Sequence, residues 1–253
     1  MSKNNIIALI PARGGSKSIP RKNLINILDK PLLAWSIQQA KESKYISRVI
    51  VSTDDAEIAE VASNYGAEVP FIRPQEFSQD ESTDFDVFKH AINWLNNNEN
   101  YQPEMIVHLR PTGPARYVSF IDKAIKIMLD NKDYDSLRSI SLSNQTPFKM
   151  WFVENEKMIS IGSILGSRES HSMPRQKLKK AYWQNGYVDI VKPKAFYKFN
   201  SMVGKNPYPF IIHHDVHDID YLDDISFVEE DLKTVIRNNF IAPEDDIQER
   251  FPV

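Results

Sequence analysis

The stretch "IIALIPARGGSKSIPRKN", residues 6–23, decides the fold that we expect for this chain. Its apolar first part is typical of a buried strand, and its second part is a loop with two adjacent glycines. The cations of this loop are Arg13, Lys17, Arg21 and Lys22. Like charges this close repel each other unless a negative group lies among them. Because the loop follows the first strand, we favour a phosphate site over the alternative of a solvated basic turn.

Composition excludes several classes of protein. The chain has 253 residues and a net charge of −3, which does not suit a protein that coats nucleic acid or an anionic membrane. It has no cysteine, which excludes disulfides, thiolate zinc sites and cysteine nucleophiles. The apolar run at residues 6–10 is too short for a signal peptide or a membrane span. We therefore expect a cytoplasmic protein without nucleic-acid or membrane partners.

The first half of the chain alternates between two patterns. Short β-branched runs predict strands at residues 6–10, 48–52, 104–109 and 136–142. Apolar side chains at helical spacing predict helices around residues 33–40, 58–65, 85–95 and 121–129, with Asp54 and Glu57 as caps of the second helix. This alternation favours an α/β fold: a Rossmann-like, mainly parallel sheet flanked by helices. Ligands of such sheets bind at the carboxyl ends of the strands.

The pattern changes after residue 143. The pattern of residues 147–161 predicts a β-hairpin, and a basic irregular stretch follows it. Further on, the sequence predicts strands at residues 187–192 and 209–216 and a helix from Ile225 to Val235. We predict a nucleotide-binding catalytic domain of residues 1–143 and 186–240, an insertion of residues 144–185, and a C-terminal tail of residues 241–253. The insertion cannot bury its apolar face alone. It is either a dimer contact or a flap on its own domain.

The glycine loop is not a known nucleotide fingerprint. It contains neither G-x-x-x-x-G-K-[ST] nor G-x-G-x-x-G, which argues against P-loop and NAD enzymes. Gly14 and Gly15 let backbone N–H groups turn towards an anion, and arginine adds a fork that matches phosphate oxygens.

A second motif is "DID", residues 218–220. Residues two apart on an extended segment point the same way, so Asp218 and Asp220 can share Mg²⁺, which needs only one or two carboxylates beside phosphates. A solvated turn is the alternative. We reject zinc at the neighbouring His213 and His217, because an extended segment separates the two rings too far.

Two further cations stand near predicted strand ends. Arg110 in "LRPTGPAR" and Arg175 in "MPRQ" either recognise a substrate carboxylate or form surface ion pairs. No Ser-His-Asp arrangement with local support argues for a covalent hydrolase.

The motifs together resemble a family. "PARGGSKSIPRKN", "VSTDD", "LRPTGPAR", "PRQKLKKAYWQNGYVDI" and "HDIDYLDD" occur in the order seen in acylneuraminate cytidylyltransferases, the CMP-sialic acid synthetases, and most resemble the bacterial branch that activates nonulosonic acids. The resemblance extends from about residue 5 to residue 230. It implies CTP as donor, a sialic-acid-like sugar acid as acceptor, Mg²⁺, release of pyrophosphate, and a homodimer formed through a small subdomain.

The resemblance also implies roles for individual residues. Arg13, Ser16 and Lys22 would hold the triphosphate in a loop that includes Ala12 and Gly14. Asn23 and Arg73 would contact the nucleoside or nucleotide, and Asp218 and Asp220 would hold magnesium. Arg110, Arg175 and Gln176 would meet the sugar acid, the last two from the neighbouring subunit, and Lys149 would point into the partner's site.

The chain departs from the sialic acid enzymes in two motifs. Their "LQPTSP" is "LRPTGP" here, which places the cation Arg110 where a glutamine usually contacts the sugar, and their "NGAIYI" is "NGYVDI" around Asn185. The acceptor is therefore left open among sialic, legionaminic, pseudaminic and Kdo-type acids.

Two other functions are compatible with the sequence. "DID" also fits the D-x-D motif of nucleotide-sugar-dependent glycosyltransferases, although these place it nearer mid-chain and have no need of a cationic triphosphate loop. A non-catalytic nucleotide-binding module is the other. We expect a cytidylyltransferase in which the anomeric hydroxyl of the sugar acid attacks the α-phosphorus of CTP in line.

Overall fold

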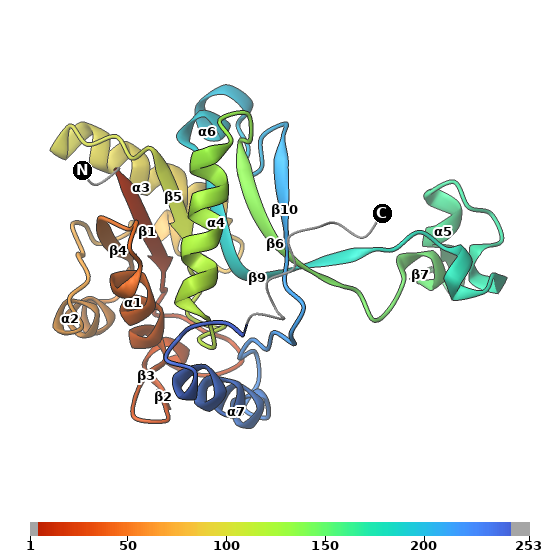
Figure 1. Ribbon diagram of the computed structural model, residues 1–253, viewed down its shortest axis with the longest axis horizontal. Helices are drawn as coiled ribbons and strands as arrows, with labels where there is room; N and C mark the ends of the chain where they lie inside the picture. The colour runs from red at the N-terminus through yellow and green to blue at the C-terminus, as the bar shows by residue number, and fades with distance from the viewer. Residues whose placement is uncertain (1–4, 244–253) are drawn as a thin grey trace.

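The computed structural model describes residues 5–243, and within that range six strands form one central sheet (Figure 1). These strands are β1 (Ile6–Pro11), β4 (Arg48–Ser52), β5 (Met105–His108), β6 (Ser136–Leu142), β9 (Tyr182–Val191) and β10 (Pro207–Ile211). Their order across the sheet is β10-β6-β9-β5-β1-β4. Two small hairpins are separate from it: β2 (Asn26–Ile27) with β3 (Lys30–Pro31), and β7 (Trp151–Glu154) with β8 (Lys157–Ser160).

The sheet is mixed but mostly parallel, as the alternating pattern predicted. β1 pairs in parallel with β4 and β5, and β10 pairs in parallel with β6. β9 is the exception, because it runs antiparallel to both of its neighbours, β5 and β6.

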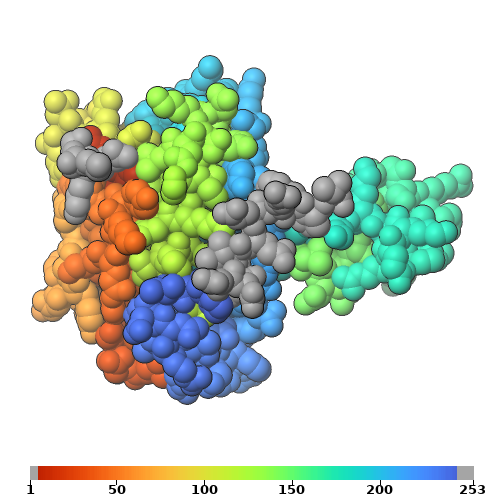
Figure 2. Space-filling model, in the orientation of Figure 1, coloured from red at the N-terminus to blue at the C-terminus, as the bar shows by residue number. Residues whose placement is uncertain are grey.

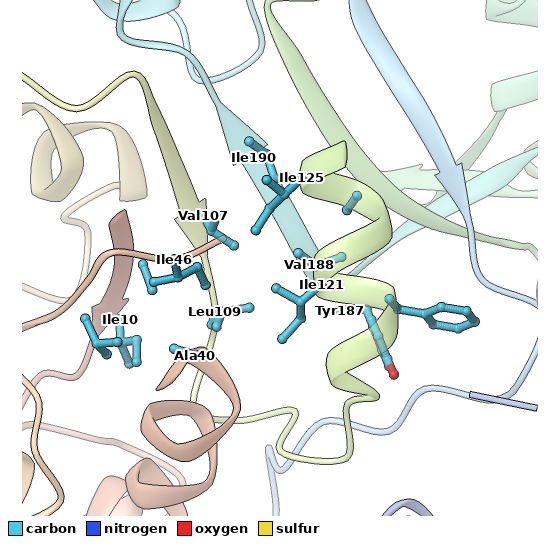
Figure 3. Close-up of a cluster of buried hydrophobic side chains, with 14 of the residues drawn as sticks. Ile10, Ala40, Ile46, Val107, Leu109, Ile121, Ile125, Tyr187, Val188 and Ile190 are labelled. Carbon is cyan, nitrogen blue, oxygen red and sulfur yellow. The ribbon is translucent and has the colours of Figure 1, made fainter. Parts of the chain in front are cut away.

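Helices cover both faces of the sheet. The helices of the described residues are α1 (Leu32–Glu42), α2 (Ala56–Asn64), α3 (Asp84–Glu99), α4 (Val118–Asp130), α5 (Ile161–Ile164), α6 (Pro193–Phe199) and α7 (Asp224–Arg237), of which α5 lies away from the sheet. One core packs α1, α2 and α4 against the sheet; Figure 3 shows Ile121 and Ile125 of α4 beside Val107 and Ile190 of the strands. The opposite face packs against α3 and α6. The successive residues of β1 alternate between these two cores, as the period of a strand requires.

The caps of two helices follow from short polar side chains. α3 begins with a capping box in which Thr83 and Asp86 satisfy each other's backbone N–H groups. The prediction that Asp54 caps α2 was wrong, because the Asp55 side chain accepts from the N–H of Ile58 instead. Asp54 accepts a hydrogen bond from the N–H of Gly14 and thereby belongs to the glycine loop.

The segment between β6 and β9 forms an arm that stands clear of the body (Figures 1 and 2). The arm comprises residues 143–181 and contains the predicted β7–β8 hairpin, α5 and short 3₁₀ helices. Its base is the outer end of the β6–β9 ladder, where Leu142 pairs with Tyr182. Residues 182–185, which we had assigned to the insertion, therefore lie in β9.

β9 contains an irregularity between its two halves. The register of the β6–β9 ladder shifts between Arg138 and Ile140, and Gly186 has a φ of +66° within this shift. A backbone with positive φ suits glycine because it has no Cβ. The inner half of β9 is buried in the sheet, and the outer half leads into the arm.

The last strand is shorter than the sequence suggested. We expected a strand at residues 209–216, but β10 ends at Ile211, and residues 212–219 run as an irregular segment towards α7. α7 packs Val228 and Leu232 against Trp35 of α1 and against Ile219. Of the predicted tail, residues 244–253 lie outside the described residues. No helix among residues 5–243 is long and apolar enough to cross a membrane.

A buried arginine supports the loop that leaves β5. The guanidinium of Arg116, which is fully buried, donates to Ser36 Oγ at 3.0 Å and to the carbonyls of Tyr187 and Arg110. Burial lowers the pKa of Arg116 to about 10, although Asp218 opposes that shift. The side chain thus joins α1, β9 and the loop after β5.

We expect Arg116→Lys to lower the free energy of unfolding by about 2–4 kcal/mol, because an ammonium cannot reach all three acceptors and leaves buried oxygens unpaired. Urea denaturation measures the change. Lys126→Ala, which removes an exposed pair with Asp130 on α4, is the control and should leave the midpoint nearly unchanged. An equally small effect of both variants would contradict the role of Arg116.

Candidate active site

The carboxyl ends of β1 and β5 open into a cavity of about 480 Å³. Among the residues whose roles the sequence predicted, those that line it are Arg13, Ser16, Lys22, Asn23, Arg73, Arg110 and Asp220. Lys17, Asp80, Asp84 and His108 also line it. The cavity therefore combines a high density of cations with a few carboxylates.

The glycine loop is fixed by hydrogen bonds from behind. Gly14 N–H donates to Asp54 Oδ1 at 2.9 Å, and a Cβ on Gly14 would lie 2.8 Å from Asp55 Oδ2, so only glycine fits there. Asn23 Nδ2 donates to the carbonyl of Arg13 at 2.9 Å and closes the loop from its other end. The loop is thus held as a turn whose outer side, with Gly15 and Ser16, lines the cavity.

The cations of the loop do not all face the cavity. Arg13 and Lys17 both pair with Asp80, at 2.8 and 2.7 Å. Arg21, with a φ of +58°, instead pairs with Asp55 and Glu57 at the start of α2. The expectation that all four cations surround one anion was therefore wrong for Arg21, because the helix cap neutralises it.

Arg73 is a buried cation with free donors. It is 4% exposed, and its Nε and Nη2 have no hydrogen-bond partner among residues 5–243. The nearest carboxylate oxygen that pairs with it is Asp54 Oδ1, 3.8 Å from Nη2. Burial lowers the pKa of Arg73 even though Asp54 opposes the shift. Such a group gains free energy when an acceptor enters the cavity.

Asp218 and Asp220 flank a fixed residue. Ile219 is fully buried, and its N–H donates to the carbonyl of Thr112 at 2.8 Å. Lys22 Nζ donates to the carbonyl of Ile219 at 2.7 Å and lies 3.3 Å from Asp220 Oδ1. The glycine loop and the aspartate motif are therefore joined by one lysine.

The two aspartates differ in environment. Asp220 is largely exposed and lines the cavity, whereas Asp218 is not among its lining residues. A Cβ on Gly113 would lie 2.5 Å from Asp218 Oδ1. Burial raises the pKa of Asp218, and Asp220 adds to the rise against the pull of Arg116 and Arg110. Two neighbouring carboxylates and no softer ligand form a donor set that fits Mg²⁺.

Arg110 follows β5 in the chain and pairs with two carboxylates. Its Nη1 donates to Asp189 at 2.9 Å, and its Nη2 donates to Asp84 at 3.2 Å. Burial opposes its charge, but Asp189 and Asp84 outweigh burial and raise the pKa of Arg110. Asp189 is 1% exposed and also accepts from Arg138 Nη1 at 3.0 Å and from Gln184 Nε2 at 2.8 Å.

His108 is the last residue of β5 and stands two positions before Arg110. It is 1% exposed, and neither ring nitrogen has a hydrogen-bond partner in the described part of the chain. Burial, reinforced by the charges of Arg110, Arg138 and Arg116, holds the pKa of His108 well below its usual value. The imidazole is therefore neutral at pH 7.

The remaining predicted residues do not line this cavity. Ala12 is buried behind the loop. Lys149, Arg175 and Gln176 are exposed on the arm, where Arg175 Nη2 donates to the carbonyl of Ser143 at 3.1 Å. The structure thus separates the arm residues from the cavity of the same chain.

Sequence reasoning missed several residues of the cavity. His108 lies in the predicted strand at residues 104–109 and stands two positions before Arg110, so this two-residue spacing was the signal that could have placed the two side chains on one side. Asp80 and Asp84 had no such signal. Asp189 had none either, because its contact with Arg110 depends on which strands are neighbours.

The fold and the cavity define an α/β protein with a cationic glycine loop near the aspartate motif of residues 218–220. The chain belongs to the cytidylyltransferase family, whose model matches residues 7–216. It is a nucleotidyltransferase of the kind that makes CMP-sugar acids, and not the glycosyltransferase that the D-x-D reading of Asp218 and Asp220 allowed.

Relatives with known products support this assignment. Pseudaminic acid cytidylyltransferase of Campylobacter jejuni is 32% identical over 88% of this chain and 94% of that protein. CMP-N,N'-diacetyllegionaminic acid synthase of the same organism is 30% identical over 88% of this chain and 93% of that protein. The fold matches the solved structure of CMP:2-keto-3-deoxy-manno-octonic acid synthetase complexed with CTP, with a TM-score of 0.67 at 15% identity, over 90% of this chain and 98% of that one.

The buried neutral His108 has a consequence for stability. When the pKa of a histidine is lower in the folded protein than in the unfolded chain, the unfolded chain binds a proton more readily. The free energy of unfolding therefore falls as pH drops below the unfolded pKa of about 6.5. We expect His108 to contribute a slope of up to about 1.4 kcal/mol per pH unit between pH 6.5 and its own pKa.

Denaturation with urea at pH 7.5, 6.5 and 5.5 measures this slope. His108→Gln should flatten it, and His213→Gln, at an exposed position, controls for the loss of one histidine from the unfolded chain. An unchanged slope in His108→Gln would show that the imidazole titrates alike in the folded and unfolded protein.

Proposed function

We propose that this enzyme transfers CMP from CTP to the anomeric hydroxyl of a nonulosonic or related 2-keto-3-deoxy sugar acid and releases pyrophosphate. The observation that supports this most directly is the cavity itself, which the glycine loop, Lys22, Asp220 and Arg110 line together. A site with several cations suits a reaction between two anionic substrates, since the substrates repel each other without such shielding.

Lys22, Arg13 and Ser16 hold the triphosphate in this proposal. The turn that follows Ala12 and Gly14 brings Gly15 and Ser16 to the cavity, where their backbone N–H groups can meet the phosphates, and Asn23 keeps the turn closed through the carbonyl of Arg13. The unpaired donors of Arg73 serve as hydrogen-bond donors to the nucleotide. Pairing of Arg13 with Asp80 is exchanged for pairing with phosphate, which forms the stronger bidentate contact.

Asp218 and Asp220 hold Mg²⁺ in the proposal. When bound, this ion neutralises charge on the phosphates and aligns the α-phosphoryl group for in-line attack. The chain's own contribution is positional: Ile219 is anchored to Thr112, and Lys22 links the carbonyl of Ile219 to the triphosphate loop. Lys22 also stabilises negative charge that develops on the phosphoryl oxygens in the transition state.

The acceptor binds beside Arg110 in this scheme. The names of the Campylobacter relatives and of the solved synthetase all describe acids that carry a carboxylate next to the anomeric carbon. Arg110 lines the same cavity as the triphosphate loop, and a guanidinium matches a carboxylate.

The first test is pyrophosphate release from CTP and Mg²⁺ with pseudaminic, legionaminic, sialic and Kdo-type acids. We expect turnover with at least one acid and none with CTP alone. ATP, GTP and UTP in place of CTP serve as nucleotide controls. Binding of CTP without pyrophosphate release from any acid would contradict the proposed reaction.

We also propose that the enzyme acts as a homodimer through its arm. Seven apolar side chains of the arm are exposed and not covered by the rest of residues 5–243: Met150, Phe152, Val153, Met158, Ile159, Ile164 and Leu165. Figure 2 shows the arm projecting from the body. We propose that a second subunit covers these side chains. In that dimer, Lys149, Arg175 and Gln176 of one subunit reach the cavity of the other.

Mixing two defective variants tests this arrangement. Arg175→Ala impairs the arm and Asp220→Asn impairs the body, so each alone should lose most of its kcat. After joint refolding, half of the dimers are mixed and each holds one intact site, so about a quarter of the sites should regain activity. No recovery in the mixture would show that each arm serves its own subunit or that the arm plays no part.

A further inference from the structure

We propose that the carboxylate of Asp84 stands where the carboxylate of the acceptor binds, so that Arg110 and His108 form an acid subsite. This inference rests on the proposed function, because it names the residues that select the acceptor of that reaction. Neither Asp84 nor His108 has a role in the assignments made above.

Arg110 is fixed from one side by a contact that a ligand cannot reach. Asp189 is 1% exposed and lies at the meeting point of three strands: β9 places it directly opposite Arg138 of β6 and His108 of β5. A Cβ on Gly186 would lie 2.9 Å from Arg110 Nη1, so the glycine makes room for the guanidinium. Asp189 is therefore the positioning residue that sets where Arg110 presents its second nitrogen.

The other partner of Arg110 is exchangeable. The side chain of Asp84 is 44% exposed and its Oδ2 lies 3.2 Å from Arg110 Nη2. It lies at the first position of α3 and lines the cavity, so a rotation of its side chain moves the carboxylate into solvent. An ion pair with this exposure contributes little to stability, so a ligand carboxylate can replace it.

His108 offers a second hydrogen-bond donor to a carboxylate that takes the place of Asp84 beside Arg110. Asp84 Oδ2 lies 3.9 Å from His108 Nδ1, which is just too far for a hydrogen bond. A carboxylate that is not tethered to α3 can move closer and accept from both the guanidinium of Arg110 and the N–H of the neutral imidazole. It would satisfy a buried ring nitrogen that has no hydrogen-bond partner among residues 5–243.

The subsite therefore selects for an acid and against the neutral sugar of the same shape. A neutral sugar that displaces Asp84 offers no carboxylate in its place, so the imidazole of His108 and Nη2 of Arg110 are left without an acceptor. Leaving buried donors unpaired costs more binding free energy than losing a contact does. Both departures of this chain from the sialic acid motifs lie here, since one contributes Arg110 and the other contributes Asp189.

Asp84→Asn is the first variant to test. It keeps the shape of the side chain and removes the competing charge, so the KM for the acceptor acid should fall about two- to fivefold while the KM for CTP stays unchanged. Asp80→Asn is the matched control, because it removes the carboxylate that pairs with Arg13 and Lys17 and should change the KM for CTP instead.

His108→Phe and His108→Gln form a second pair. Phenylalanine fills the ring volume without an N–H and should raise the KM for the acid about tenfold, since a hydrogen bond to a charged group is lost. Glutamine keeps a donor and should restore much of the affinity. Calorimetry of each acid with protein and CMP measures binding without turnover.

The outcomes separate this inference from the reaction on which it rests. Pyrophosphate release by the wild type with unchanged acid KM in both Asp84→Asn and His108→Phe would overturn the subsite and leave the reaction standing. A shift of the CTP KM in Asp84→Asn would also overturn it, because Asp84 would then belong to the nucleotide end. Failure of every acid to bind or to release pyrophosphate would overturn both.

Discussion

The antiparallel insertion of β9 between β5 and β6 is the constraint on which this structure depends. One strand completes the sheet, brings Asp189 into line with Arg138 and His108, and continues outward as one side of the arm. The same ladder therefore connects the floor of the cavity to the surface proposed for dimer contact. A shift of β9 by one residue would turn Asp189 to the other face of the sheet, where apolar side chains of α4 pack.

Charge balance within the chain explains how so many cations coexist around one cavity. Arg13 and Lys17 share Asp80, Lys22 meets Asp220, and Arg21 is neutralised by the cap of α2. Most of these carboxylates are partly exposed, so they can be exchanged for a substrate anion at small cost. Asp189 is different because it is buried and paired with two arginines, and it has no route to solvent.

Features that depend on local sequence pattern could be predicted from the sequence. Features that depend on which distant segments become neighbours in the fold could not. The strands β1, β4, β5 and β6, the helices between them and the β7–β8 hairpin follow from periodicity in a few residues. The choice of Asp55 over Asp54 as cap, and the diversion of Arg21 to α2, depend on how the loop folds back over the helix. The pairing of Arg110 with Asp189 joins residues far apart in the chain and depends on the strand order alone.

The contact between Lys22 and Ile219 has a consequence for how the protein is made. Its two residues are separated by 197 positions, and Ile219 is buried against helices at both ends of the described chain, α1 and α7. Proteins generally begin to fold from the N-terminus as they leave the ribosome. The glycine loop therefore emerges early but lacks its lysine anchor until nearly the whole chain has been synthesised. A nascent or truncated chain can form β1 and α1 and still have no aspartate motif beside its phosphate loop, so partial products of synthesis are not partial enzymes.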